Sequence, residues 1–209
     1  YVPHWPQPGL VVRDAARGTR VETLAYFGRL ARLPGWLRST AFRRRLAALG
    51  VDLRLSESAW NDYHDVDLAI ASRAEGASML ELKPATKLTN AWLAGVPALL
   101  GDEPAFRGLR LSPLDASPIA NADDAVDAVA RLQGDLLAYA RMVANGHVRA
   151  QAFTRDAVRE RWLALIDEVA AQCAHAPSLV HFVRSVSAQR REARRFRARH
   201  VDEQARAAR

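Results

Sequence analysis

The 209-residue chain has little cysteine, almost no lysine and no long apolar run. Its single cysteine, Cys173, excludes a disulfide framework and is typical of a reducing compartment. No apolar segment approaches the ~18 residues that a membrane span needs, and no segment has the pattern of a signal peptide. These absences predict a cytoplasmic protein, and a content of 49% hydrophobic residues is enough for a buried core.

Several nucleotide-binding and metal-binding patterns are absent. Neither GxGxxG after the first expected strand nor GxxxxGK[ST] occurs, which disfavours dinucleotide cofactors and P-loop ATPase chemistry. The histidines show no ligand spacing with Cys173 or with each other, so we predict no metal. The chain begins at Tyr1, without a methionine and inside an apolar segment, and we therefore expect it to be a piece of a longer protein.

The positive charge of the chain is concentrated in its last residues. The formal net charge is +7, and residues 184–209 hold nine arginines against three acidic residues. The high isoelectric point of about 10.4 therefore describes this tail more than the rest of the chain. We expect a basic helix over residues 178–209, after a break at the segment that ends with Pro177.

Short apolar strands alternate with helices along most of the chain. This pattern predicts an α/β fold, a Rossmann-like doubly wound parallel sheet with helices on both faces, followed by C-terminal helices that close the domain. We expect a Pro-rich connector over 1–14 and one domain over 15–172. The expected strands are 21–27, 51–55, 66–71, 96–100 and a short one near 109–111 or 118–120. The expected helices are 39–49, 86–94, 122–132, 135–143, 149–153 and 154–171.

Both lysines of the chain, Lys83 and Lys87, lie in one stretch, where a helix is expected to begin near Thr86. Lysine is a flexible point charge that suits phosphate oxygens, and a helix N-terminus attracts anions. The stretch therefore predicts a phosphate or diphosphate site.

In a parallel sheet, ligands bind beyond the carboxyl ends of the strands. The residues that follow the expected strands supply cations, small residues and carboxylates that could accept hydroxyl hydrogens. They are Gly28, Arg29, Ser56, Glu57, Ser58, Ser72, Arg73, Glu75, Gly101, Asp102 and Glu103.

Three segments, in this order, resemble the C-terminal, nucleotide-sugar-binding half of GT-B-fold "group 1" glycosyltransferases. Gly28-Arg29-Leu30 is similar to their phosphate loop, and residues 63–71 to the segment before the donor site. Residues 83–100 are similar to their signature helix, which ends in Ala-x-Gly-x-Pro. The resemblance covers residues 1–171 and implies a divergent bacterial enzyme of polysaccharide biosynthesis.

The resemblance implies roles for particular residues. Arg29 and Lys87 would stabilise the leaving diphosphate as catalytic residues, with Thr86 beside them, and Asn90 would bind the ribose. The remaining donor-binding residues would be Gly28, Glu57, Arg73 and Lys83. Leu82 and Asn90 stand where the family has two glutamates, and the lysine that commonly follows the Gly-Arg-Leu loop is absent.

The resemblance also implies the partners of the chain. It implies a nucleoside-diphosphate sugar as co-substrate, no cofactor or metal, and an acceptor domain preceding Tyr1, without which this piece would be inactive. We expect the basic tail to contact anionic lipid weakly at the inner membrane face or to brace another domain. The alternatives are a Rossmann-like module with a nucleic-acid-contacting arm, which the tail's lack of a groove-reading motif disfavours, and half of a nucleotide-sugar epimerase.

Several isolated residues have two interpretations. His4 and Gln7 in the connector could face the donor cleft or belong to a rigid linker. Asp65 and Asp67 could be catalytic or could stand at a solvated strand start. The tryptophans Trp60, Trp92 and Trp162 are expected in the core, because each has apolar neighbours at helical spacing.

Overall fold

The computed structural model of the chain describes residues 2–74 and 77–174. The basic tail predicted over 178–209 lies outside the described residues, as does Glu75. The expectations for the tail therefore stay predictions.

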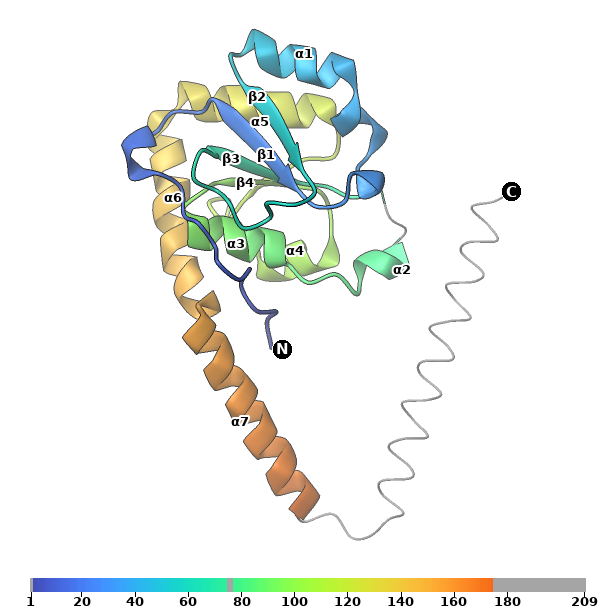
Figure 1. The fold of residues 1–209 in the computed structure, drawn as a ribbon, viewed down its shortest axis with the longest axis vertical. Helices are drawn as coiled ribbons and strands as arrows, with labels where there is room; N and C mark the ends of the chain where they lie inside the picture. The colour runs from blue at the N-terminus through green and yellow to red at the C-terminus, as the bar shows by residue number, and fades with distance from the viewer. Residues whose placement is uncertain (1, 75–76, 175–209) are drawn as a thin grey trace, which may run out of the picture.

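The core of the protein is a parallel sheet of five strands (Figure 1). The strands are β1 (Thr23–Phe27), β2 (Asp52–Ser56), β3 (Leu68–Ala71), β4 (Ala98–Leu100) and β5 (Ser117–Pro118). Their order is β2-β1-β3-β4-β5, and every pair is parallel. This confirms the predicted Rossmann-like α/β fold. The chain leaves β1 toward β2 on one side and then returns to β3 on the other, which creates a topological switch point between β1 and β3.

Helices cover both faces of the sheet (Figure 1). They are α1 (Thr40–Ala48), α2 (Ala77–Leu80), α3 (Thr86–Ala94), α4 (Pro104–Leu109), α5 (Ala122–Gly134), α6 (Leu136–Ala150) and α7 (Arg155–Ala174). Alternate residues of β1 divide between two cores: Leu24 and Tyr26 pack with α1 and α5, while Ala25 and Phe27 pack with α3 and α4. The strands are apolar throughout because both of their faces are buried.

The predicted helix boundaries have clear local causes. Ser39 begins α1 by accepting a hydrogen bond from the Phe42 amide at 3.1 Å, and Asn121 begins α5 through the Asp124 amide at 3.0 Å. Gly95 ends α3 with φ of +73°, and a Cβ there would lie 3.0 Å from the His147 ring. The close approach and the left-handed backbone both require glycine at this position.

In the second half, one of the two alternative strand positions and one separate helix are not found. Residues 109–111 form no strand, because Leu109 is the last residue of α4, a helix that the sequence reading missed although Pro104 stands at its first turn. The alternative strand near 118–120 corresponds to β5. Residues 149–153 form no separate helix, since α6 continues to Ala150 and a 3₁₀ turn follows.

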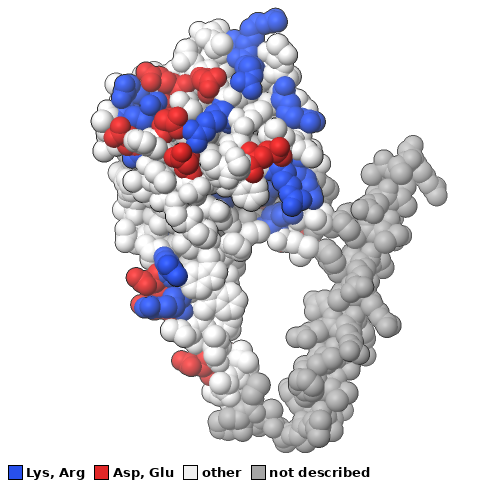
Figure 2. Space-filling model, in the orientation of Figure 1, with Lys and Arg blue, Asp and Glu red and all other residues white. Residues whose placement is uncertain are grey.

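Helix α7 extends away from the sheet (Figure 1) and does not close the domain as expected. Its apolar side chains Trp162, Leu163 and Ile166 are 39%, 53% and 56% exposed. Much of its surface in Figure 2 carries no charge. The expectation that Trp162 lies in the core was therefore wrong, whereas Trp92, 2% exposed, is a core residue as predicted.

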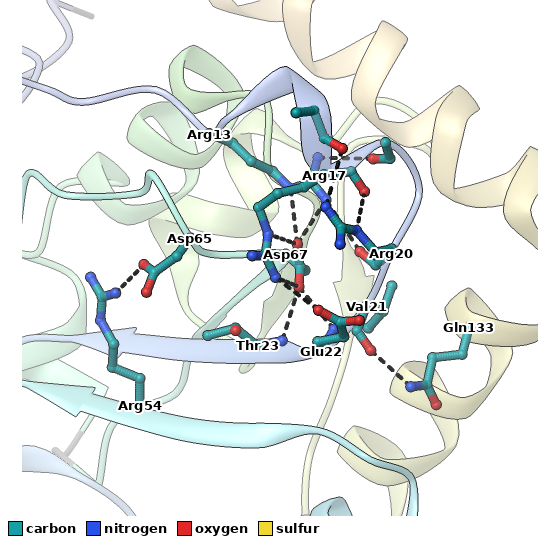
Figure 3. Close-up of polar contacts among 12 residues, drawn as sticks. Arg13, Arg17, Arg20, Val21, Glu22, Thr23, Arg54, Asp65, Asp67 and Gln133 are labelled. Carbon is teal, nitrogen blue, oxygen red and sulfur yellow. Dashed lines mark hydrogen bonds and ion pairs between the residues drawn. The ribbon is translucent and has the colours of Figure 1, made fainter.

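The Pro-rich connector has no helix over residues 2–14, as predicted, and it is tied to the domain by a buried ionic cluster (Figure 3). Arg13 and Arg17 both contact the carboxylate of Asp67, each through a closest N–O distance of 2.7 Å. The backbone amides of Glu22 and Thr23 donate to the same carboxylate at 2.8 and 3.0 Å. Asp67 is fully buried, so it is neither at a solvated strand start nor in a position to contact a ligand.

Candidate functional site

A cavity of about 470 Å³ lies at the carboxyl ends of β1 and β3, next to the start of α3. Gly28 and Arg29 reach it from the end of β1, Arg73 from the end of β3, and Lys87 from the first turn of α3. This is the topological switch point, where ligands of open parallel sheets bind. The described residues that line it are His4, Gln7, Tyr26, Phe27, Gly28, Arg29, Arg32, Trp60, Tyr63, Arg73, Lys83, Pro84, Thr86, Lys87 and Asn90.

The structure brings most of the sequence-predicted site residues into this cavity. Among the residues to which the family resemblance gave a role, Glu57 is the exception, since it is not part of the lining. The other described residues that follow the strands, Ser56, Ser58, Ser72, Gly101, Asp102 and Glu103, do not line it either. The carboxylate of Glu57 accepts the backbone N–H of Leu30 at 2.8 Å, so Glu57 shapes the loop after β1 instead of facing the cavity. The predicted residues that line the cavity are Gly28, Arg29, Arg73, Lys83, Thr86, Lys87 and Asn90.

The loop after β1 requires glycine at position 28. Gly28 has φ of +147°, a conformation that residues with a Cβ rarely adopt. A Cβ there would also lie 2.8 Å from the Tyr26 hydroxyl and 3.0 Å from the Lys87 ammonium nitrogen. Any larger residue would therefore push on the two side chains that form the floor of the cavity.

The Lys87 ammonium is held in an unfavourable position for a charge. It lies 3.9 Å from the centroid of the Tyr26 ring, a cation–π contact. Burial lowers the pKa of Lys87 to about 7, and the nearby Arg73 guanidinium adds to the effect, while Glu103 opposes it. An anionic ligand in the cavity would restore the charged form.

The carboxylate of Glu103 is buried and forms an ion pair with the cavity residue Arg73. Burial raises the pKa of Glu103, although Arg73 and Lys87 partly offset this. Its Oε1 atom is buried and has no hydrogen-bond partner among the described residues. The expectation that Glu103 accepts a ligand hydroxyl is not supported by this placement, because its side chain is only 2% exposed.

The start of α3 presents backbone donors to the cavity. The N-cap residue, Ala85, makes no side-chain hydrogen bond to the helix amides, so no N-cap side chain competes for the N–H groups at the start of α3. Thr86 Oγ1 is buried and has no partner among the described residues. Lys83 stands just before the helix, where burial and then the charges of Arg32, Arg73 and Arg29 lower its pKa.

The opposite side of the cavity is uncharged and is built partly by the connector. Asn90 is buried and its carbonyl oxygen accepts the backbone N–H of Gln7 at 3.1 Å, which fixes the connector at the cavity rim. Gln7 and His4 line the cavity, so of their two interpretations the cleft-facing one has structural support. Trp60 was expected in the core, but it is 38% exposed and lines this rim.

Tyr26 is a cavity residue that the sequence did not predict, because alternation along β1 identifies it only as a core residue.

Among the described residues, no group of three or more His, Cys, Asp or Glu side chains could hold a metal ion. In the same part of the chain, none of the helices has the length and apolar character that crossing a membrane requires.

Comparison with known proteins gives a limited result. No family model matches the chain, and no curated protein matches it by sequence. Among solved structures, the chain is similar to one described as "Crystal Structure of TarM", with a TM-score of 0.47 and 11% sequence identity. The match covers 78% of this chain and 36% of that one, so this chain spans a minor part of the neighbour's length.

Proposed function

We propose that this domain binds a nucleoside-diphosphate sugar and is the donor-binding half of a glycosyltransferase that moves the sugar to a glycan or lipid-linked acceptor. The observation that carries the proposal is the convergence of Arg29, Arg73, Lys83 and Lys87 with the start of α3 in one cavity at the switch point. The Gly28-Arg29-Leu30 loop and the 83–100 segment, on which the family resemblance rests, both contribute to this cavity.

The charge of the cavity favours a diphosphate over a neutral ligand. Among the described residues that line it, five are cationic, including Arg32, and none is acidic. The buried carboxylate of Glu103 forms an ion pair with one of them, Arg73. A diphosphate would pair with Arg29 and Lys87 and would accept hydrogen bonds from the α3 amides.

In the proposed reaction, this domain stabilises the leaving group. As the bond between the anomeric carbon and the diphosphate breaks, negative charge grows on the phosphate oxygens. Arg29 and Lys87, together with the helix amides and Thr86, would stabilise that charge, and preorganised donors of this kind lower the barrier. We propose that no metal ion is needed, because the cations are supplied by side chains. The acceptor would be bound by a further domain, which we place before Tyr1.

The uncharged side of the cavity would take the nucleoside and the sugar. Trp60, Tyr63 and the connector residues His4 and Gln7 offer aromatic and polar surface there. The carbonyl oxygen of Asn90 already accepts one hydrogen bond from the connector. We therefore propose that Asn90 contributes to ribose binding mainly by holding Gln7 in place.

A thermal-shift panel with UDP, GDP, dTDP, ADP and CMP tests the proposal. At least one diphosphate, at about 100 times its Kd, is expected to raise the melting temperature by roughly 5–10 °C. CMP, which has a single phosphate, serves as the control and should have a much smaller effect. A panel in which no diphosphate shifts the melting temperature more than CMP would contradict the proposal.

Binding of the diphosphate should be accompanied by proton uptake at Lys87. Its pKa is about 7 in the empty cavity, so at about pH 8 most of the lysine is neutral. A bound diphosphate would raise this pKa, and up to about one proton should be taken up per ligand. The affinity for the diphosphate should accordingly fall as pH rises above about 7, the pKa of Lys87 in the ligand-free protein.

Calorimetry in buffers of different ionisation enthalpy measures this uptake. Lys87→Arg is the matched control, because arginine keeps its charge and should bind without taking up a proton. Equal proton uptake by the parent and by Lys87→Arg would show that another group titrates.

A further inference from the structure

A second groove lies along the edge strand β5, and no residue of it lines the cavity described above. Its volume is about 530 Å³. Three arginines line it: Arg107 within α4, Arg110 directly after α4, and Arg131 near the end of α5. Two hydroxyl groups, those of Ser112 and Ser117, join them, and the described part of the chain contributes no carboxylate to the lining. The groove is therefore strongly electropositive.

The side chain of Arg110 has a buried donor without a hydrogen-bond acceptor among the described residues. Its Nε atom is buried and makes no hydrogen bond within the described parts of the chain. Leaving a buried, charged donor without an acceptor is costly. Arg107 pairs with Asp102 at 2.6 Å, but both side chains are more than half exposed, so this contact neutralises little. Arg131 donates to the neutral hydroxyl of Ser117 at 2.9 Å.

The loop that carries Arg110 and Ser112 is held by hydrogen bonds to Asp115. Asp115, which is 2% exposed, accepts the backbone N–H groups of Leu111 and Ser112 at 2.7 and 2.8 Å. Its other oxygen accepts from Asn145 at 2.9 Å and pairs with Arg149 at 3.2 Å. The charge of Asp115 is thus paired with Arg149, which does not line the groove. The loop is organised before any ligand arrives.

We propose that this groove is a second anion site, which binds a phosphate group of a ligand other than the sugar donor. Planar guanidinium groups match the oxygen geometry of phosphate, and hydroxyl groups add neutral donors. A neighbouring cavity of about 400 Å³ shares Arg107, Arg110 and Pro118 with the groove, so a ligand has room to extend beyond its phosphate. The carboxylates Asp102 and Asp124 also line that neighbour, so a phosphate is favoured in the groove, where Arg131 joins the two shared arginines.

Titration of the isotope-labelled chain with inorganic phosphate, followed by amide NMR, tests this site separately from the donor cavity. We expect two distinct sets of shifts, one at residues 110–118 and one at residues 28–30 and 86–90. Arg110→Gln should weaken the first set by at least about tenfold and leave the second set unchanged. Arg131→Gln, on the more exposed side of the groove, should act in the same direction and covers the case that Arg110→Gln misfolds.

Arg44→Gln is the matched control, because it removes the same charge from an exposed position on α1. It should leave both sets of shifts unchanged. The proposal is overturned if residues 110–118 do not respond to millimolar phosphate, or if Arg110→Gln and Arg131→Gln respond as the parent does.

Co-sedimentation with vesicles identifies the source of the phosphate. Vesicles of phosphatidic acid in phosphatidylcholine are compared with pure phosphatidylcholine, using Arg110→Gln and Arg44→Gln so that the basic tail is the same in both. Lower recovery of Arg110→Gln on the phosphatidic acid vesicles assigns the site to a lipid headgroup. Equal recovery of the two variants, with the NMR effect present, assigns it to a soluble phosphate ligand.

Discussion

Lys87→Met is expected to make the protein more stable while it removes most of the affinity for a nucleoside diphosphate. The Lys87 ammonium is desolvated and lies near Arg73, and its compensating contacts are the Tyr26 ring and the more distant Glu103. Methionine fills a similar volume without a charge. We expect the free energy of unfolding to rise by roughly 1–4 kcal/mol, as when other buried charges are replaced by apolar side chains.

The gain in stability should depend on pH in a defined direction. The pKa of Lys87 is about 7 in the folded protein, whereas the ordinary lysine value, which applies to the unfolded chain, is 10.5. Below the lower value both states hold the proton, so the full cost of burying the charge is present. As pH rises from the folded to the unfolded value, the folded state loses its proton first and this cost disappears. The advantage of Lys87→Met should therefore be largest in weak acid and small near the ordinary lysine pKa.

Urea unfolding at about pH 6 and about pH 10 measures this difference. Diphosphate binding, followed by calorimetry, should weaken by about 1.5–3 kcal/mol, the usual range for a charged hydrogen bond. Arg44→Met, on the exposed surface of α1, is the control and should change neither quantity beyond about 0.5 kcal/mol. If Lys87→Met were destabilising, the buried charge of Lys87 would not be a cost to stability. If the variant bound diphosphate like the parent, Lys87 would not contact the phosphate.

Asp67→Asn is expected to destabilise the fold by about 3–5 kcal/mol, the range for breaking one partner of a buried ion pair. Asp67 accepts six hydrogen bonds, four from the guanidinium groups of Arg13 and Arg17 and two from the amides of Glu22 and Thr23. The Arg13 and Arg17 side chains are only 7% and 17% exposed. Asparagine would remove the carboxylate that pairs with Arg13 and would leave Arg17 only its longer contact with Glu22, at 3.4 Å. Its amide would also turn an N–H group toward one of the two guanidinium groups.

The contribution of Asp67 should also be lost in acid. Burial raises the pKa of this carboxyl, but the hydrogen bonds from Arg17, Glu22 and Arg13 outweigh it, and the pKa lies below the ordinary aspartate value. The stabilisation is therefore fully present above that ordinary value and is lost as pH falls through the folded pKa. Asp67→Asn should show a flatter dependence of stability on acid pH than the parent.

Asp65→Asn is a matched control two residues away. Asp65 pairs with Arg54, but its side chain is 60% exposed, so its removal should cost no more than about 1 kcal/mol. If urea unfolding showed the same loss of unfolding free energy for both variants, the buried cluster would not stabilise the fold more than the exposed ion pair does. Because Arg13 anchors the connector that carries Gln7 and His4, Asp67→Asn should also weaken ligand binding, whereas Asp65→Asn should not.

The sequence by itself determined the class of the fold and the position of the cations. Apolar runs such as residues 66–71 predict buried strands, and Ser39, Gly95 and Asn121 mark helix ends through local hydrogen bonds and backbone conformation. Since parallel strands end at the same edge of a sheet, the residues after them were expected to converge. Arg29, Arg73, Thr86 and Lys87 do line one cavity. These inferences depend only on near neighbours in the chain.

Tertiary structure decided which of these residues meet and what surrounds them. The strand order, with β3 next to β1, brings Arg73 beside Lys87, while Glu57 turns to the Leu30 amide outside the cavity. Tertiary packing also buries Trp92 in the core and leaves Trp60 partly exposed at the cavity rim, although both have apolar neighbours in sequence. The pairing of Asp67 with Arg13 and Arg17 joins residues about fifty positions apart. Periodicity identifies the face of an element, but it does not identify the neighbour against which that face packs, and burial, ion pairs and pKa values all depend on that neighbour.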